Sequence, residues 1–146
     1  MNNKTFLLKF FCAFGLLFSI SAFATSLPTI ELKIGKEVIK VEVASTAASQ
    51  QLGLMFRKSM PDNAGMLFIF DQKAAHCFWM KNTLIPLAVA FIEDDGRIVN
   101  IDEMKPQTED NHCPTRAVRY VLEMNTQWFD KKQIGAGKLV EGLPKP

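Results

Sequence analysis

Apolar and polar residues alternate along several short stretches of this chain, a pattern that predicts strands with one face toward a core. Residues 30–34 and 39–43 alternate strictly, and the intervening Gly35-Lys36 can form a tight turn, so the two stretches are expected to pair as a hairpin. Residues 117–124 alternate in the same way. A last short strand is expected at residues 138–140.

Two other stretches are apolar on both faces, which is typical of buried central strands. These are residues 65–70 and 84–92. The acidic, glycine-ended residues 93–96 predict a turn that returns the chain as a partner strand over residues 97–103. A further short strand is expected at residues 77–80.

Two short helices complete the expected elements. One covers residues 47–55, where Ser45 or Thr46 can cap the first turn, and the other covers residues 126–134 and ends at Gly135. Many short strands with two small helices predict an α+β fold that is mainly antiparallel β, a compact curled or barrel-like sheet.

The N-terminus has the features of an export signal. Two lysines precede the eleven-residue apolar run 10–20, and Ala22-Phe23-Ala24 fits a cleavage site for small residues. The run is shorter than the roughly 20 apolar residues that a membrane-spanning helix needs. Residues 1–24 are therefore expected to be a cleaved signal peptide, and residues 25–146 a single globular domain that is periplasmic or secreted and meets the membrane only during export.

The charge of the expected mature protein is balanced. Loss of Lys4 and Lys9 from the 17 basic residues leaves 15, against 15 acidic residues. A nucleic-acid surface needs an excess of Lys and Arg, so we expect no nucleic-acid partner.

Two cysteines remain after cleavage, Cys77 and Cys113, and each follows a histidine. In an oxidising compartment two such thiols most often form a disulfide. Free thiols and a metal site with His76 and His112 remain alternatives, although neighbouring residues on a strand point to opposite faces and rarely supply two ligands. We therefore expect a disulfide and no bound metal or cofactor.

The stretch Phe78-Trp79-Met80-Lys81-Asn82-Thr83 concentrates aromatic, cationic and amide side chains before a buried strand. In a recognition pocket, Trp79 would supply a flat apolar floor, Lys81 a charge, and Asn82 both a hydrogen-bond donor and an acceptor. The structural alternative is a core strand that leads into a capped turn.

Polar residues elsewhere could extend this pocket. Glu123 and Asn125 end the stretch 117–124, and Arg57 follows the first expected helix. If the fold brings them together, Arg57 and Lys81 would face Glu123 and Asn125. The alternative for this set is an ion-pair network with a structural role.

Common catalytic signatures are absent from the sequence: it has no phosphate-binding glycine loop, no G-x-S-x-G and no H-E-x-x-H. Six methionines remain after cleavage and could bind Cu(I) with the histidines, although methionine more often fills gaps in a core.

Several motifs in order resemble the family named domain of unknown function 192. The residues that carry the resemblance span about 37–141 and include Gly53-Leu54-Met55-Phe56-Arg57, Gly65-Met66-Leu67-Phe68, the stretch 78–83, Cys113-Pro114 and Arg119-Tyr120-Val121-Leu122-Glu123. The resemblance implies a small, mainly β prokaryotic domain that is often exported, and it assigns no activity or site residues.

Three functions follow from these residues. The first is an exported, non-enzymatic module that binds a small ligand, a glycan or an envelope protein through Arg57, Trp79, Lys81, Asn82, Glu123 and Asn125. The second is an enzyme with an Arg/Lys/Glu site for an anionic substrate. The third is a periplasmic copper or redox protein.

Overall fold

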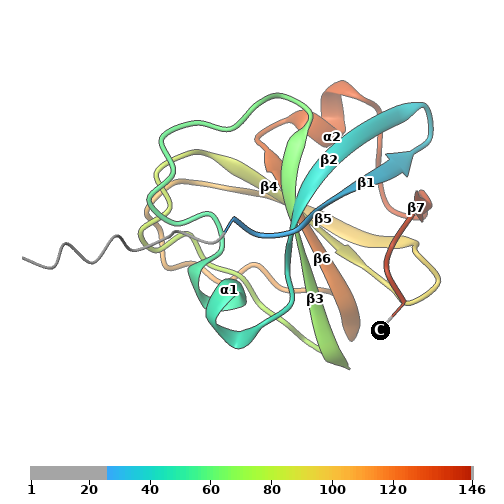
Figure 1. The fold of residues 1–146 in the computed structure, drawn as a ribbon, viewed down its shortest axis with the longest axis horizontal. Helices are drawn as coiled ribbons and strands as arrows, with labels where there is room; N and C mark the ends of the chain where they lie inside the picture. Colours follow the sequence, from blue (N-terminus) through green and yellow to red (C-terminus); the bar gives the residue numbers. More distant parts are fainter. Residues whose placement is uncertain (1–25, 146) are drawn as a thin grey trace, which may run out of the picture.

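The computed structural model describes residues 26–145, which form one curled, seven-stranded sheet (Figure 1). The strand order is β5-β4-β6-β3-β2-β1-β7. The strands are β1 (Thr29–Ile34), β2 (Glu37–Ala44), β3 (Ala64–Ala74), β4 (Leu87–Ile92), β5 (Ile98–Met104), β6 (Val118–Asn125) and β7 (Val140–Glu141). The expected α+β, β-rich and mainly antiparallel class with two short helices is confirmed.

One pair of strands is parallel. β2 pairs with β3 from Lys40 opposite Ala64 to Ala44 opposite Phe68, whereas the other neighbouring strands are antiparallel. Parallel neighbours need a crossover of about a dozen residues or more, and residues 45–63 supply it. This crossover contains α1 (Ala47–Leu52), which lies beside one end of the sheet (Figure 1).

Local sequence explains both helices. Thr46 caps α1: its hydroxyl accepts a hydrogen bond from the Ser49 amide, and the Ser49 hydroxyl accepts one from the Thr46 amide. The second helix, α2 (Trp128–Lys131), is shorter than expected: Gln127 at its start is left-handed and makes no side-chain cap, and the helix buries Trp128 and Phe129.

The sheet has apolar side chains on both faces, which gives two core clusters. One cluster includes Leu32, Ile39, Leu67, Leu122 and Phe129. The other contains the residues that alternate with these along the strands, together with side chains from outside the sheet; among them are Leu54, Met66, Phe68, Met80, Val89 and Val121. Because both faces are covered, β4 is buried along its whole length.

Some expected boundaries differ from the structure. Residues 77–80 make a single bridge, between Phe78 and His112, and no strand. β4 begins at Leu87, because residues 81–86 form turns. The expected signal peptide, 1–24, lies outside the described residues. Within residues 26–145, none of the helices is long and apolar enough to cross a membrane.

Candidate functional site

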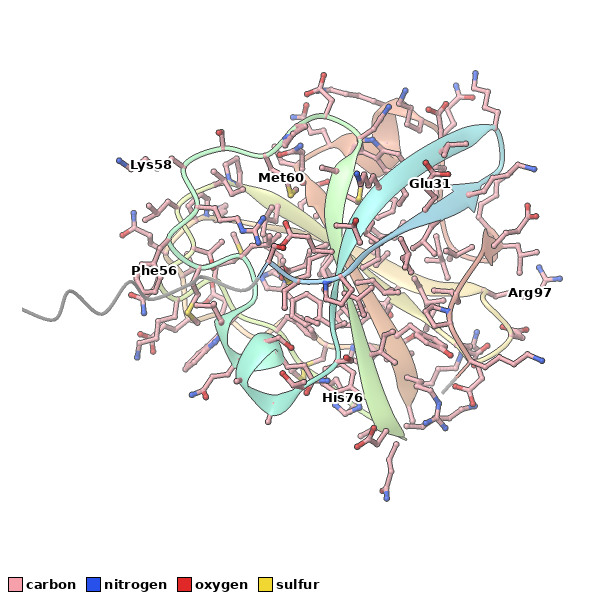
Figure 2. The ribbon with its side chains drawn as sticks, viewed as in Figure 1. Glu31, Phe56, Lys58, Met60, His76 and Arg97 are labelled. Carbon is pink, nitrogen blue, oxygen red and sulfur yellow. A yellow bond between two sulfur atoms is a disulfide. The ribbon has the colours of Figure 1, made fainter. Side chains whose placement is uncertain are left out.

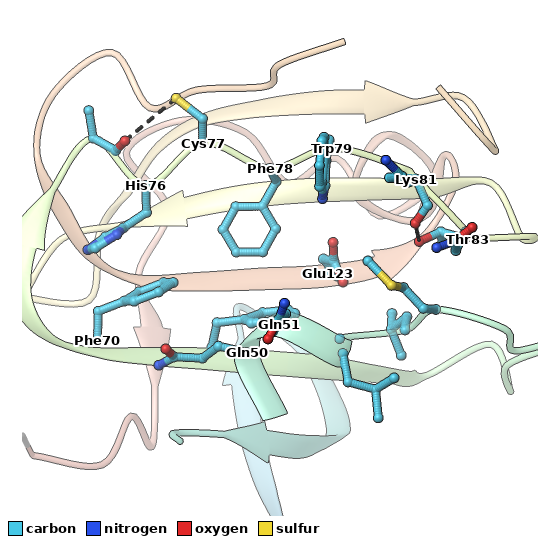
Figure 3. Close-up of a pocket in the computed structure, with 17 residues that line it drawn as sticks. Gln50, Gln51, Phe70, His76, Cys77, Phe78, Trp79, Lys81, Thr83 and Glu123 are labelled. Atoms are coloured by element: carbon cyan, nitrogen blue, oxygen red, sulfur yellow. Dashed lines mark hydrogen bonds between the residues drawn. The ribbon is translucent and has the colours of Figure 1, made fainter. Parts of the chain in front are cut away.

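A cavity of about 690 Å³ lies between α1 and the segment that carries Trp79 (Figure 3). Its walls come from residues 50–55, from residues 75–79 and 81–83, and from Phe68, Phe70 and Glu123. Segments far apart in the sequence therefore meet here: the crossover, β3 with the residues that follow it, and the central strand β6. The volume falls within the range of about 300–1,000 Å³ that is typical of small-molecule sites.

Glu123 is the buried acidic residue of this cavity. It lies on β6 opposite Met66 of β3 and Val89 of β4, so apolar strands flank it on both sides. Its exposed fraction is only 4%. Burial raises the pKa of Glu123 to about 8, since the carboxylate loses its hydration in apolar surroundings.

The Glu123 carboxyl group has no partner among residues 26–145: none of the ion pairs and side-chain hydrogen bonds found there includes it. Every fully enclosed side-chain oxygen or nitrogen in this part of the chain does have a hydrogen-bond partner. The unpartnered carboxyl oxygens therefore retain contact with the cavity. In Figure 3 this group lies between Trp79 and Gln51, which line the same cavity.

Close packing of two strands holds Glu123 in place. Gly65 of β3 pairs with Met124 of β6, and a Cβ atom at residue 65 would lie 2.4 Å from the Glu123 carbonyl oxygen and 2.5 Å from the Met124 Sδ. Only glycine permits this approach of the backbones.

The segment that carries Trp79 is fastened to the loop that precedes β6. Phe78 and His112 exchange two backbone hydrogen bonds of 2.8 Å, and the Met80 amide donates to the Thr108 carbonyl oxygen at 3.0 Å. The expected disulfide between Cys77 and Cys113 is present beside this bridge.

Alternation along the same segment sends Phe78 and Met80 toward the core and leaves Trp79 at the surface. The Trp79 indole lines the cavity and is 45% exposed. The Lys81 Nζ lies 5.2 Å from the centre of this ring and 3.4 Å from a carboxylate oxygen of Glu109. Trp79 thus supplies an aromatic rim that already contacts one ammonium group.

Asn82 has a backbone role besides its place in the cavity wall. Its φ is 57°, a left-handed conformation that asparagine tolerates better than most residues. Its carbonyl oxygen accepts a 2.9 Å hydrogen bond from the amide of Phe56, an exposed residue on the loop between α1 and β3 (Figure 2). The cavity wall at Asn82 is therefore tied to this loop.

The structure separates the other two candidates from the cavity. Arg57 binds Glu42 of β2 through contacts of 2.5 and 2.7 Å. Asn125 donates to the carbonyl oxygens of Met60 and Pro61 and lines a second cavity of about 380 Å³. The arrangement of Arg57 and Lys81 facing Glu123 and Asn125 is therefore not formed, because the crossover brings Arg57 to Glu42 instead.

Gln50, Gln51 and Phe70 of the cavity wall were not among the predicted site residues, and His76 had been considered only as a metal ligand. Gln50 and Gln51 come from α1, while Phe70 and His76 come from β3 and its end. The His76 ring stacks on Phe70 with 3.6 Å between ring centres. Two adjacent glutamines in a short helix are ordinary surface residues, so no signal in the sequence marked them.

Metal-binding chemistry has few donors here. Within the described part of the chain there is no group of three or more His, Cys, Asp and Glu side chains that could hold a metal ion. The bridged Cys77 and Cys113 carry no thiol, and four of the methionines are buried among apolar side chains; these are Met66, Met80, Met104 and Met124.

Two solved structures resemble this fold closely. A proposed transcription regulator from Sinorhizobium meliloti 1021 is 31% identical to this chain, covering 81% of it and 96% of the regulator, with a TM-score of 0.78. A protein of unknown function from Novosphingobium aromaticivorans is 33% identical, covering 80% of this chain and 86% of that protein, with a TM-score of 0.77.

The comparison with curated proteins gave no match. A family model does match: that of domain of unknown function 192 (DUF192), described as "uncharacterized ACR", covers residues 30–142. This match confirms the resemblance carried by the sequence motifs, and this chain belongs to the DUF192 family.

Proposed function

We propose that this protein is an exported binding domain that takes a small ligand into the cavity between α1 and Trp79. The observation that carries the proposal is the Glu123 carboxyl group, which is buried, faces the cavity and has no partner within residues 26–145. A buried polar group without a partner costs stability, and a ligand that bonds to it would recover part of that cost.

The composition of the walls supports a small molecule. Aromatic surface from Phe70, Phe78 and Trp79 combines with a few polar groups, and this is the usual composition of ligand sites. A cavity of this volume favours a small ligand or one sugar unit of a glycan over a large protein surface.

Export is supported by two features. Residues 1–24 have the order of a secretory signal, and the disulfide between Cys77 and Cys113 belongs to an oxidising compartment. Mass measurement of the protein recovered from its host would test this, because cleavage near Ala24 removes the leader.

Fluorescence can test ligand binding, because Trp79 and Trp128 are the two tryptophans. Trp128 is buried at the second cavity, so Trp128→Phe leaves Trp79 as the sole reporter. A ligand in the proposed cavity changes the emission of this variant and raises its melting temperature. Trp79→Ala should abolish binding, whereas Leu139→Ala, at a similarly exposed apolar residue outside the cavity wall, should not. Equal binding by Trp79→Ala and the parent would refute the proposal.

A second candidate is an enzyme in which Glu123 acts as a general acid. The raised pKa keeps this carboxyl group protonated near neutral pH, as proton donation requires. Arg57, engaged by Glu42, does not contribute to this candidate site. Glu123→Gln would then abolish turnover while ligand binding persists; equal turnover in that variant would exclude this role.

A further inference from the structure

We propose that the ligand of this cavity carries an organic ammonium or guanidinium group, which pairs with the carboxylate of Glu123 beside the Trp79 ring. This inference rests on the proposed function and adds the chemical class of the ligand.

The first argument is charge. Glu123 is the only acidic side chain in the cavity wall, and no cation of residues 26–145 lies within ion-pair distance of it. Lys81, the one lysine of the wall, is held by Glu109 instead. An ammonium group supplied by the ligand would form a charge-assisted hydrogen bond, which is roughly twice as strong as a neutral one.

The second argument is the aromatic wall. Phe70, Phe78 and Trp79 line the cavity together with Glu123. Aromatic faces attract cations, and the effect is larger where water is excluded. The contact between the Lys81 Nζ and the Trp79 ring, at 5.2 Å, shows that this rim accepts an ammonium group. A carboxylate with aromatic rings is thus a matched site for an organic cation.

Binding of a cation must also release a proton. Burial keeps Glu123 protonated below pH 8, so a cation that pairs with the carboxylate displaces that proton. A neutral ligand would instead leave the proton in place. The other titratable groups of the wall are His76 and Lys81, and the residues opposite Glu123 on β3 and β4, Met66 and Val89, do not titrate.

The test is calorimetric titration of the purified protein. The cationic probes are benzylamine and agmatine. The neutral probes are benzyl alcohol, which has a shape similar to that of benzylamine, and methyl β-glucoside. The inference predicts that benzylamine and agmatine bind, that benzyl alcohol binds at least tenfold more weakly, and that nearly one proton is released per cation at pH 7. Titration in buffers of different ionisation enthalpy measures this release. Cation affinity should rise about tenfold from pH 6 to pH 7, and His76→Gln should retain this rise.

Glu123→Gln should weaken benzylamine binding at least tenfold and abolish proton release. Proton release on cation binding is measured in the parent protein, so it tests the charge inference even if Glu123→Gln folds poorly. Benzyl alcohol or methyl β-glucoside binding in a Trp79-dependent manner, without cation binding, would overturn the charge inference and leave the proposed function intact. Cation binding that survives Trp79→Ala with no proton release would overturn both.

Discussion

Arg57 and Glu42 form a two-point ion pair that joins the crossover to β2, with nitrogen–oxygen distances of 2.5 and 2.7 Å. Hydrogen bonds from Arg57 hold the pKa of Glu42 below its ordinary value, and the same bonds raise the pKa of Arg57. Because Arg57 is engaged by Glu42, it does not pair with Glu123 in the cavity, as the sequence had suggested it would.

Loss of this ion pair should be measurable but small. We expect Arg57→Gln to lower the free energy of unfolding by about 1 kcal/mol at pH 7, since both side chains are partly exposed. Glu42 has a lowered folded pKa, so its contribution is present above pH 4.5 and is lost as the pH falls through the folded value. Urea unfolding of parent and variant should therefore converge at low pH. Lys33→Gln, at a longer and more exposed pair, should change stability by less than about 0.5 kcal/mol.

Glu123 should make the protein less stable as the pH rises. Between its ordinary pKa of 4.5 and its folded pKa of about 8, the folded state holds one more proton than the unfolded state. The free energy of unfolding should therefore fall by up to about 1.4 kcal/mol per pH unit across that window. Glu123→Gln cannot ionise and should remove this slope. Equal slopes in parent and variant between pH 5.5 and 7.5 would contradict the raised pKa of Glu123 in the folded protein.

Removal of the disulfide should destabilise the fold. The 36-residue separation of Cys77 and Cys113 corresponds to roughly 3–4 kcal/mol by the chain-entropy estimate. The double variant Cys77→Ser with Cys113→Ser should show this loss in chemical denaturation, and a reducing agent should reproduce it in the parent. Insensitivity of the parent to reduction would show that the bridge contributes nothing.

Gly65→Ala should be among the most harmful small substitutions. The added methyl group would meet the backbone of Glu123 and the sulfur of Met124, so β3 and β6 must separate at a cost of about 1–3 kcal/mol or more. Gly135→Ala is the matched control, because a Cβ atom there has no neighbour within 4 Å and the backbone has no positive φ. Thermal unfolding of the two variants should differ by several degrees.

Local patterns explain how far the fold could be predicted from the sequence. The β1–β2 hairpin follows from strict alternation and a two-residue turn, and residues 84–103 follow from a turn between apolar runs. The parallel pairing of β2 with β3 could not be predicted, because it depends on contacts between distant segments that no local period encodes.

The site was predictable only in part, because it too depends on contacts between segments that are distant in the sequence. Alternation along β6 places Glu123 on the same face as Arg119, and a sequence alone suggests that such a face is wet. At Glu123 the face is covered by α1 and the Trp79 segment, so the acid is buried. Trp79 and Lys81 were identifiable because they stand together in the chain, whereas Gln50 and Gln51 approach them only through the crossover.

The two walls of the cavity are built with unequal stiffness. The Trp79 wall is secured by a covalent bridge and a backbone ladder, but α1 buries none of its side chains and is anchored by one 2.7 Å hydrogen bond from Gln50 to the Ile69 carbonyl oxygen. Few apolar contacts mean a low cost of local opening, so the α1 amides should exchange with deuterium sooner than those of Phe78 and His112. Local opening of this cavity should therefore begin at α1, while the Trp79 wall stays in place.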